Sequence, residues 1–234
     1  MTEFSTSPRS RVRQISGRGH YDRATIYAIV DEAPVCHVGF AGAGKAGDGE
    51  AGEAQPYVIP SLHARDGDTL LLHGAPKSRL IQHVAAGHPV CVSVTLFDGW
   101  VLGAAACSHS MNYRSVVLFG RGRLIEDPEE KMRAFALFTE RMMPGRWAEV
   151  RPPNDKELAA TAIVAIAIEQ ASAKVRDGSA RDSQADQALG AWAGVVPVRM
   201  AAGAPEAEAY RPEGTPLDRS IRAYLGKEQD VPNK

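Results

Sequence analysis

Short runs of β-forming residues, each bounded by turn residues, fill most of the chain after Pro34. The runs expected to form strands are residues 35–40, 56–63, 69–73, 90–97, 100–107, 113–125, 161–175 and 194–200. Strands that follow one another through short turns pair antiparallel, and Asp98-Gly99 is the strongest hairpin turn signal in the chain. A barrel of five or six of these strands, with few helices, is the architecture that this pattern predicts, in a mainly β protein with flanking helices (α+β).

Helix start and stop signals interrupt this pattern at four places. The expected helices are residues 23–32, 78–86, 127–142 and 154–160. Asp22 is the expected N-cap of the first helix, and Pro128 follows the cap residue of the third. Gly87 closes the second helix because glycine tolerates the left-handed conformation at that position.

The chain length of 234 residues suits one domain with a tail. Residues 1–19 are polar and rich in Arg, Ser and Gly, which predicts a flexible N-terminal arm. Residues 20–200 contain all the expected strands and form the predicted domain. Residues 201–234 are rich in Pro, Glu and Ala, and we expect a loose, extended C-terminal segment there.

Charge and composition exclude several classes of protein. Lys and Arg total 27 against 28 Asp and Glu, so no general positive field favours nucleic acid or an anionic membrane. No apolar run reaches the about 20 residues of a membrane helix, and no apolar stretch follows the N-terminal arginines as in a secretory signal. Three scattered cysteines, Cys36, Cys91 and Cys107, are typical of reduced thiols. We therefore expect a cytoplasmic protein without nucleic-acid or membrane partners.

Two phosphate-binding patterns overlap between residues 39 and 47. Gly42 to Gly47 matches GxGxxG, but the glycine-rich residues that follow are poor helix formers, and that motif must open a helix. Gly39 to Lys45 imitates GxxxxGK, but Ala46 occupies the position of the magnesium-binding Ser or Thr. We interpret residues 41–55 instead as a flexible insertion in a hairpin.

The histidines do not form a metal-binding pattern. His63, His73, His83 and His88 have neither i, i+4 helical spacing nor a neighbouring cysteine pair. We expect no metal site.

The segment TLLLHGAPKSR, residues 69–79, carries the best candidate for a binding site. A strand ends at His73, a Gly-Ala-Pro turn follows, and Lys77, Ser78 and Arg79 stand where a helix begins. Free backbone N–H groups, a hydroxyl and two cations within one turn are suited to a phosphate group. The alternative is an ordinary solvated helix end.

Several longer segments resemble the pyridoxamine 5′-phosphate oxidase-related family of FMN-binding split barrels. These segments are YDRATIYAIVDEAPVCHVGF, PYVIPSLHARDGDTLLLHGAPKSR, VCVSVTLFDGWVLGAAACSHSMNYRSVVLFG, PGRWAEVRPPNDKEL, ASAKVR and WAGVVP. The chain looks closest to the flavin-nucleotide-binding, nitroimidazole-resistance-like branch. The resemblance spans about residues 20–200 and implies a six-stranded antiparallel split β-barrel. It also implies a homodimer with FMN at the interface.

The resemblance assigns site residues by position. It places the flavin ring along Val58, Ile59, Pro60 and Ser61, the ribityl chain beside Leu72 and His73, and the phosphate at Lys77, Ser78 and Arg79. Arg114 and Ser115 match polar groups that the partner subunit commonly presents to the cofactor, and Trp192 lies near a C-terminal segment that reaches the site in the oxidase. His73 is the implied catalytic residue, because the nitroimidazole-resistance branch has a histidine beside the flavin at this position.

Departures from the family pattern argue against vitamin B6 oxidation. Ser61 replaces a basic residue of the oxidase, Ser78-Arg79 replaces an Arg-Lys pair, and the C-terminal Arg and His signature is not recognisable.

The sequence leaves two functions open. The first is an FMN-dependent oxidoreductase that reduces or oxidises a small molecule by two electrons, in the manner of a nitroreductase. The alternative is a non-catalytic module on the same fold that binds flavin, the deazaflavin F420 or haem.

Overall fold

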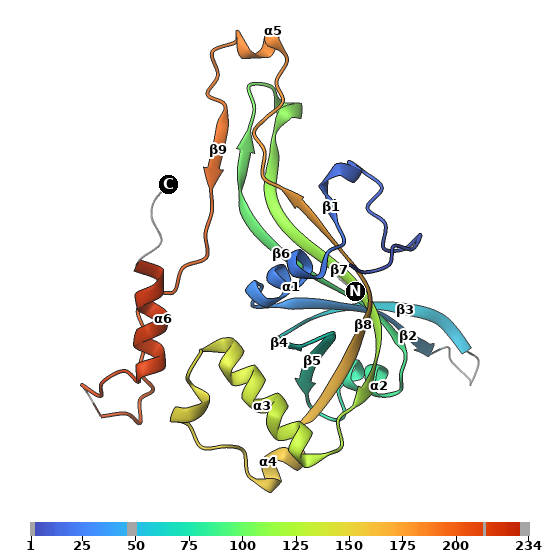
Figure 1. Cartoon of the computed structure of the whole chain (residues 1–234), viewed down its shortest axis with the longest axis vertical. Helices are drawn as coiled ribbons and strands as arrows, with labels where there is room; N and C mark the ends of the chain where they lie inside the picture. The colour runs from blue at the N-terminus through green and yellow to red at the C-terminus, as the bar shows by residue number, and fades with distance from the viewer. Residues whose placement is uncertain (1–2, 46–50, 213, 230–234) are drawn as a thin grey trace.

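The computed structural model describes residues 3–45, 51–212 and 214–229, and most of them belong to one antiparallel sheet (Figure 1). Its strands are β1 (Gly19–His20), β2 (Cys36–Lys45), β3 (Ala51–Ser61), β4 (His63–Asp66), β5 (Thr69–Gly74), β6 (Pro89–Leu102), β7 (Ser110–Leu124), β8 (Ala162–Arg176) and β9 (Gly194–Pro197). The order is β3-β2-β6-β7-β8-β5-β4, with β1 on β8 and β9 on β6. The fold class is as predicted, but the sheet has nine strands where six were expected, and it is not closed.

The described residues contain six α-helices, of which α1, α2 and α3 pack on the sheet. They are α1 (Arg23–Glu32), α2 (Arg79–Ala85), α3 (Pro128–Met142), α4 (Asp155–Ala160), α5 (Gln184–Gln187) and α6 (Arg219–Gln229). The predicted start signals are confirmed, since the side chain of Asp22 accepts a hydrogen bond from the Thr25 N–H and that of Asp127 accepts one from the Glu130 N–H. Within the described residues, no helix is long and apolar enough to cross a membrane.

The core lies between one face of the sheet and helices α1 and α2. Ile26, Ile29 and Val30 of α1 are almost fully buried, as the spacing of apolar residues predicted. Leu80, Ile81 and Val84 of α2 join the same cluster, against alternate residues of the central strands. A smaller cluster forms where α3 packs on the opposite face, over β4, β5 and the start of β8.

The centre of that opposite face carries no helix in the described part of the chain. Pairing across the strands puts Pro60 beside His37, His37 beside Ser93, and Ser93 beside Val117. Opposed residues of paired strands share a face, and Val58, two residues from Pro60, lies there too. We call these five residues the open face. It is flanked by α3 at one end, and the N-terminal residues cross β7 and β8 beside it.

The expected hairpin at Asp98-Gly99 is wrong. β6 runs without a turn from Pro89 to Leu102, and the pairing with β7 only shifts register between Phe97 and Gly99. Glycine is required here because β9 pairs with β6 at this point, and a Cβ on Gly99 would lie 2.6 Å from the carbonyl oxygen of Val196. The dipeptide therefore marks a bulge with a close backbone approach.

The expected loop over residues 41–55 is mostly strand. Gly42 pairs with Gln55 and Gly44 with Gly52, so β2 and β3 extend far into this region, and residues 46–50 lie outside the described residues. Because Gly42 and Gly44 lie on a strand, they do not open a helix as a dinucleotide-binding motif would.

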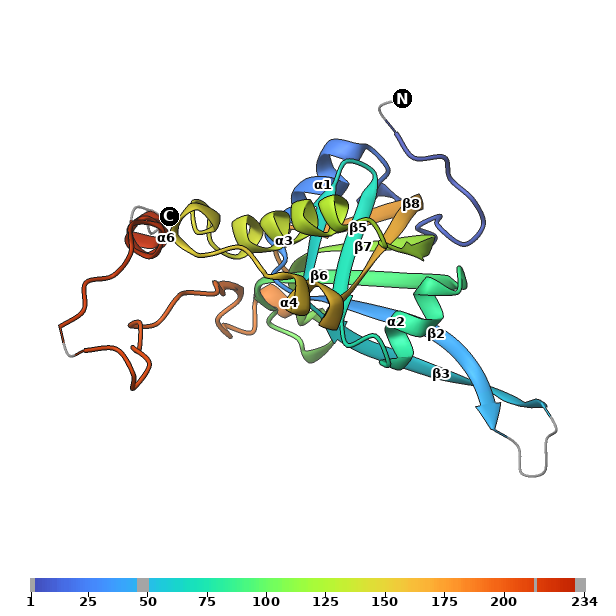
Figure 2. The ribbon, with the colours of Figure 1, turned by 90° about the horizontal axis from the view of Figure 1, so that it is seen from below.

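The described residues between β9 and residue 218 form no helix or strand, as expected of an extended segment, but a helix follows them. β9 ends at Pro197, shorter than expected, and helix α6 was not anticipated. Asp218 forms an ion pair with Arg146, and the Ser220 hydroxyl donates to Glu149. Figure 2 shows the chain after β9 leaving the sheet before α6 lies near the end of α3.

Candidate functional site

The start of α2 presents the predicted phosphate-binding groups at the surface. Ser78 is the N-cap, and its hydroxyl accepts a hydrogen bond from the Ile81 N–H at 3.3 Å. Lys77 and Arg79 are exposed, and neither pairs with a carboxylate in the described residues. The first backbone N–H groups of a helix have no partner within it. The turn therefore offers two free cations, a hydroxyl and backbone donors to one anion.

A row of rings connects this turn to the strand expected to carry the flavin. The Arg79 guanidinium lies over the ring of Tyr57 on β3, with 4.2 Å between Cζ and the ring centroid. Tyr57 stacks on Phe40 of β2 at 5.3 Å between centroids, and Phe40 contacts the ring of His83 on α2 at 4.6 Å. The structure thus brings Arg79 and β3 together, as the resemblance implied.

The residues assigned to the flavin ring divide between two faces of β3. Val58, 68% exposed, and Pro60 belong to the open face. Ile59 points to the other face and packs against the core, and Ser61 alternates with Pro60. Side-chain contact with a ring on the open face is therefore available only from Val58 and Pro60.

Leu72 and His73 also point to opposite faces of the sheet. Leu72 is fully buried in the core, so only its backbone can contact a ligand. His73 is on the face that carries α3, with its ring edge-on to Phe138 at 4.8 Å between centroids. Partial burial lowers the pKa of His73, which favours the neutral form of its ring. Its ring nitrogens have no hydrogen-bond partner in the described residues.

Arg114 and Ser115 lie at the start of β7 and are engaged within the chain. The Arg114 guanidinium binds Asp98 at 2.8 Å and also pairs with Glu32, and both carboxylates raise the pKa of Arg114. The Ser115 hydroxyl donates to the Lys174 carbonyl at 3.3 Å. An ion-pair role for Arg114 was not foreseen, because it depends on a contact between residues that are far apart in the sequence.

Trp192 is 65% exposed and lies beside Gly194 at the start of β9. β9 pairs with the end of β6, and the same part of β6 pairs with the start of β7. α2 packs near the other end of β7, against Gly122 (Figure 1). Within one chain, Arg114 and Trp192 therefore lie near one end of β7, and Lys77 and Arg79 lie near the other.

Three aromatic residues beside the site were missed from the sequence. Phe40 and Tyr57 are direct partners in the β2–β3 hairpin, and His83 is one turn into α2. A hairpin that continues through residues 41–55 pairs Phe40 with Tyr57. Because the sequence indicates a flexible insertion at these residues, that pairing was not predicted.

A family model described as pyridoxamine 5′-phosphate oxidase matches residues 22–175. The chain belongs to the pyridoxamine 5′-phosphate oxidase family. Its structure is similar to that of the flavocytochrome Anf3 from Azotobacter vinelandii, with 34% identity, a TM-score of 0.80, and 93% of this chain and 96% of the other covered.

Two further solved structures are similar to the chain. A FAD and heme binding protein from Mycobacterium smegmatis is 36% identical, with a TM-score of 0.78 and coverage of 88% of this chain and 96% of the other. A protein from Bacteroides thetaiotaomicron, described as a 5-nitroimidazole antibiotic resistance protein, is 25% identical, with a TM-score of 0.52 and coverage of 67% and 86%. Comparison with curated proteins gives no match.

Proposed function

We propose that this chain is a flavin-dependent oxidoreductase that holds the flavin phosphate at Lys77, Ser78 and Arg79. The observation that carries the proposal is the pair of cations at the start of α2, Lys77 and Arg79, which pair with no carboxylate in the part of the chain that the structure describes, with Arg79 against Tyr57 of β3. A phosphate bound there would satisfy both charges and the free N–H groups of the helix. The open face lies on the other side of β3, the last strand in the sheet order, and offers space for a flat ring that reaches around this edge.

The residues present fit a flavin phosphate and part of its ring. Arg79 would grip the phosphate with two N–H groups, Lys77 would add a point charge, and Ser78 would donate its hydroxyl hydrogen. Val58 and Pro60 would contact the ring and exclude water from one side. When bound, a flavin supplies two-electron transfer to or from a small molecule, and the protein supplies orientation and electrostatics.

His73 is the side chain that we place beside the reacting substrate. It lies on the same side of the sheet as the open face, and its neutral ring can accept a proton. Its partner Phe138 fixes the ring from one side. We assign no nucleophile, because the cofactor carries the chemistry.

We propose further that the protein works as a homodimer, with FMN or FAD at the interface. Apart from His37, the open face consists of small or apolar side chains, which a second copy can cover. The partner copy would then supply its Arg114, Ser115 and Trp192, which a single chain keeps away from its own Lys77. The relatives named above include FAD-binding and heme-binding proteins, so FAD joins FMN as a candidate.

The three cysteines support a cytoplasmic location. Cys36 is buried, Cys107 is exposed, and all three are free thiols in the structure. Free thiols persist in a reducing compartment.

The test is to purify the protein, record its absorbance, and identify the released ligand by mass spectrometry. The bound flavin is then reduced with NADH or NADPH without oxygen and mixed with a nitroaromatic or a quinone. We expect reduction and reoxidation faster than those of free flavin at the same concentration. Flavin that binds but turns over no faster than free flavin would identify a binding module instead.

Haem binding is the second candidate function, and similarity to two relatives favours it. The flavocytochrome and the FAD and heme binding protein share 34% and 36% identity with this chain over most of its length. A haem iron needs a neutral imidazole with a free nitrogen. Among the described residues, four histidine side chains make no hydrogen bond, and these are His20, His37, His73 and His88.

Burial lowers the pKa of His73, which favours the neutral ring that a metal requires. Titration with haemin, followed by the Soret band, tests this function. We expect a sharp band for the parent protein and its loss in the His73→Ala variant. An unshifted haemin spectrum in the parent protein would exclude haem binding.

A further inference from the structure

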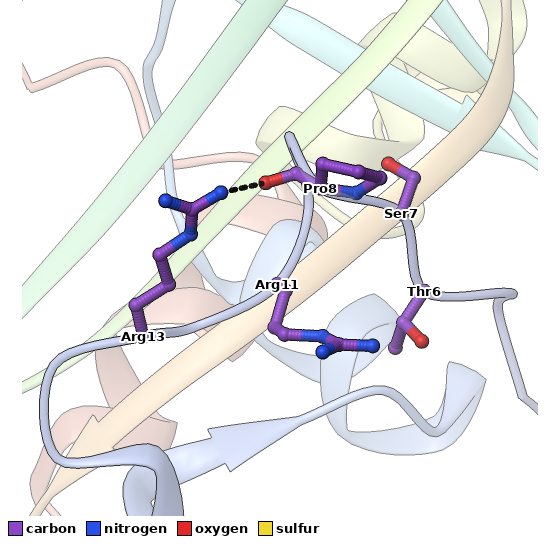
Figure 3. Close-up of a pocket in the computed structure, with 5 residues that line it drawn as sticks. All are labelled: Thr6, Ser7, Pro8, Arg11 and Arg13. Atoms are coloured by element: carbon purple, nitrogen blue, oxygen red, sulfur yellow. Dashed lines mark hydrogen bonds between the residues drawn. The ribbon is translucent and has the colours of Figure 1, made fainter.

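The N-terminal residues form a loop with a hollow of about 420 Å³ (Figure 3). It is lined by Thr6, Ser7, Pro8, Arg11 and Arg13. Figure 3 shows the side chains of Arg11 and Arg13 pointing apart, and Arg13 donates to the Pro8 carbonyl at 3.5 Å. The two arginines therefore do not converge on one ligand.

A second pocket, on the α3 side of the sheet, has charged groups in a more defined arrangement. Its volume of about 330 Å³ is in the range of small-molecule sites. Four strands and helix α3 contribute to its lining, which includes Asp66, Thr69, Ala167, Arg121, Arg123 and Glu130. We call this pocket the sheet pocket.

Strand pairing shows how the sheet pocket is arranged. Asp66 of β4 pairs with Thr69 of β5. Ala167 of β8 lies between Thr69 and Arg121 of β7 and pairs with both. Paired residues share a face of the sheet, so these four residues form one row across four strands. Neighbouring strands are about 4.8 Å apart, which puts the Cα atoms of Asp66 and Arg121 about 14 Å apart.

The middle of this row is open because its side chains are small. Ala167 is exposed although β8 has strands on both sides. Leu71 and Ala165, which pair with each other in the next row, continue an apolar floor toward α3. The Thr69 hydroxyl has no hydrogen-bond partner in the described residues. The row therefore offers an apolar surface with one free hydroxyl beside it.

The two ends of the row carry opposite charges that no neighbour neutralises. Asp66 is exposed, and its carboxylate makes no ion pair or hydrogen bond in the described residues. Arg121 meets no carboxylate in the same part of the chain, and its guanidinium donates to the Gly87 carbonyl at 2.8 Å. Arg123 is already neutralised by Glu130, with 3.1 Å between Nη1 and Oε2. The sheet pocket thus has a free negative charge at one end and a free positive charge at the other.

We propose that the sheet pocket binds a small zwitterion whose ammonium and carboxylate groups are separated by a short apolar chain, as in an ω-amino acid. Asp66 binds the ammonium group, Arg121 binds the carboxylate, and the chain between them lies over Ala167. This site does not include Lys77 or Arg79 and does not depend on the proposed flavin function.

The position of the Arg121 guanidinium sets the length of the ligand. Gly87, whose carbonyl holds it, precedes β6, and β6 lies on the other side of β7 from β8. The positive end of the row is therefore directed away from Asp66. An α-amino acid, whose two charges share one carbon atom, does not span this distance, and a ligand with one charge leaves one end of the row unpaired.

The experiment measures the affinity of the full-length protein for four probes by NMR titration. The probes are ε-aminocaproate, which carries both charges, caproate and hexylamine, which carry one each, and alanine, whose charges are adjacent. We expect ε-aminocaproate to bind about 3- to 10-fold more tightly than each of the others, as for one partly exposed charge contact.

Two charge variants assign the ends of the ligand. Asp66→Asn removes the partner of the ammonium group, so this variant should bind ε-aminocaproate and caproate equally. Arg121→Gln removes the partner of the carboxylate, so it should bind ε-aminocaproate and hexylamine equally. Asp155→Asn, which removes an exposed carboxylate of α4 outside the pocket, is the matched control and should leave all four affinities at the parent values.

A third variant tests the floor of the pocket. Ala167→Leu fills the space between the two charges without removing either, and it should abolish binding of ε-aminocaproate. FMN affinity should stay at the parent value in every variant, because none changes the start of α2. The inference would be overturned if the parent binds ε-aminocaproate no more tightly than caproate or hexylamine, or if Ala167→Leu binds it as tightly as the parent.

Discussion

The guanidinium of Arg79 lies over the ring of Tyr57, with 4.2 Å between Cζ and the ring centroid. Tyr57 is held in turn by the ring of Phe40 on the neighbouring strand. The cation at the start of α2 is therefore oriented by β3 before any ligand arrives, and less side-chain freedom is lost on binding. The phosphate site and the strand expected to contact the ring are parts of one packed unit.

Replacing Arg79 by Ala should weaken flavin binding without unfolding the protein. The charge-assisted contact to phosphate contributes about 1.5–3 kcal/mol. We expect FMN affinity to fall roughly 10- to 150-fold. Quenching of flavin fluorescence during titration measures the change.

The control for this prediction is Arg79→Lys, which keeps the charge and loses the planar fork. Its affinity should lie between those of the parent and the alanine variant. If the alanine variant binds FMN as tightly as the parent, the phosphate lies elsewhere on the molecule.

Replacing His73 by Ala should leave flavin affinity nearly unchanged and lower the rate of reoxidation by a nitroaromatic. His73 is on the α3 side of β5 and is not one of the phosphate-binding residues. The parent rate should also fall as the pH drops below the ordinary histidine value of 6.5 and the ring takes up a proton, and this dependence should vanish in the variant. Stopped-flow absorbance across pH 5 to 8 gives both results. An unchanged rate at every pH would remove His73 from the reaction.

Local signals predicted most of the elements, and long-range contacts explain where the prediction failed. Asp22 and Asp127 mark helix starts correctly, because a cap depends on residues only three positions away. Asp98-Gly99 was misread as a turn, because its conformation depends on β9, about a hundred residues further along the chain. The same limit applies to the site. The phosphate turn is local and recognisable, whereas the stacking of Arg79 on Tyr57 depends on the register of two strands.

His63 should make the folded state sensitive to mild acid. It is 1% exposed, its Nε2 bonds the Val30 carbonyl at 2.9 Å, and its Nδ1 has no partner in the described residues. That carbonyl needs a side-chain donor because Pro34, its usual helical partner, has no N–H. Burial is the main cause that lowers the pKa of His63 below its ordinary value of 6.5, and the charge of Arg141 lowers it further.

The direction of the pH dependence follows from proton uptake by the folded and unfolded chains. Below pH 6.5 the unfolded chain binds the proton more readily than the folded chain, so the free energy of unfolding falls as the pH falls toward the lower folded pKa. Urea unfolding between pH 5 and 8 measures this slope. His63→Gln keeps a donor for the Val30 carbonyl without titrating and should flatten the slope, whereas His109→Gln, at an exposed position, should not. Equal slopes in all three proteins would contradict the assignment.

Gly120 should not tolerate a side chain. It lies where the pairing of β7 with β8 shifts register, and an added Cβ would lie 1.9 Å from the carbonyl oxygen of Ala167. Gly120→Ala should therefore lower the free energy of unfolding by about 2 kcal/mol or more, because the central strands must separate to admit it. Gly178→Ala is the matched control, since nothing lies within 4 Å of its added Cβ. Chemical denaturation measures the free energy of unfolding of both variants. If Gly120→Ala is as stable as the parent, β7 and β8 are further apart at this position than in the structure.

A charge on the open face should loosen the dimer and the flavin together. Val58 is 68% exposed in the single chain, and the proposed second copy and the flavin ring both cover it. Val58→Asp would bury an unpaired carboxylate on assembly, which costs several kcal/mol, so the dimer should dissociate at least about tenfold more readily. Val35→Asp introduces the same charge at an exposed valine outside the sheet, 43% exposed, and should leave the assembly intact.

Because coupling between two binding equilibria is reciprocal, the loss of dimer stability and the loss of flavin affinity must scale with each other. Adding FMN should drive Val58→Asp back toward the dimer, and removing flavin from the parent should loosen its dimer. Sedimentation velocity with and without FMN measures both changes. If Val58→Asp weakens the dimer while its FMN affinity stays at the parent value, the flavin site is complete within one chain, and the partner's Arg114 and Trp192 take no part in it.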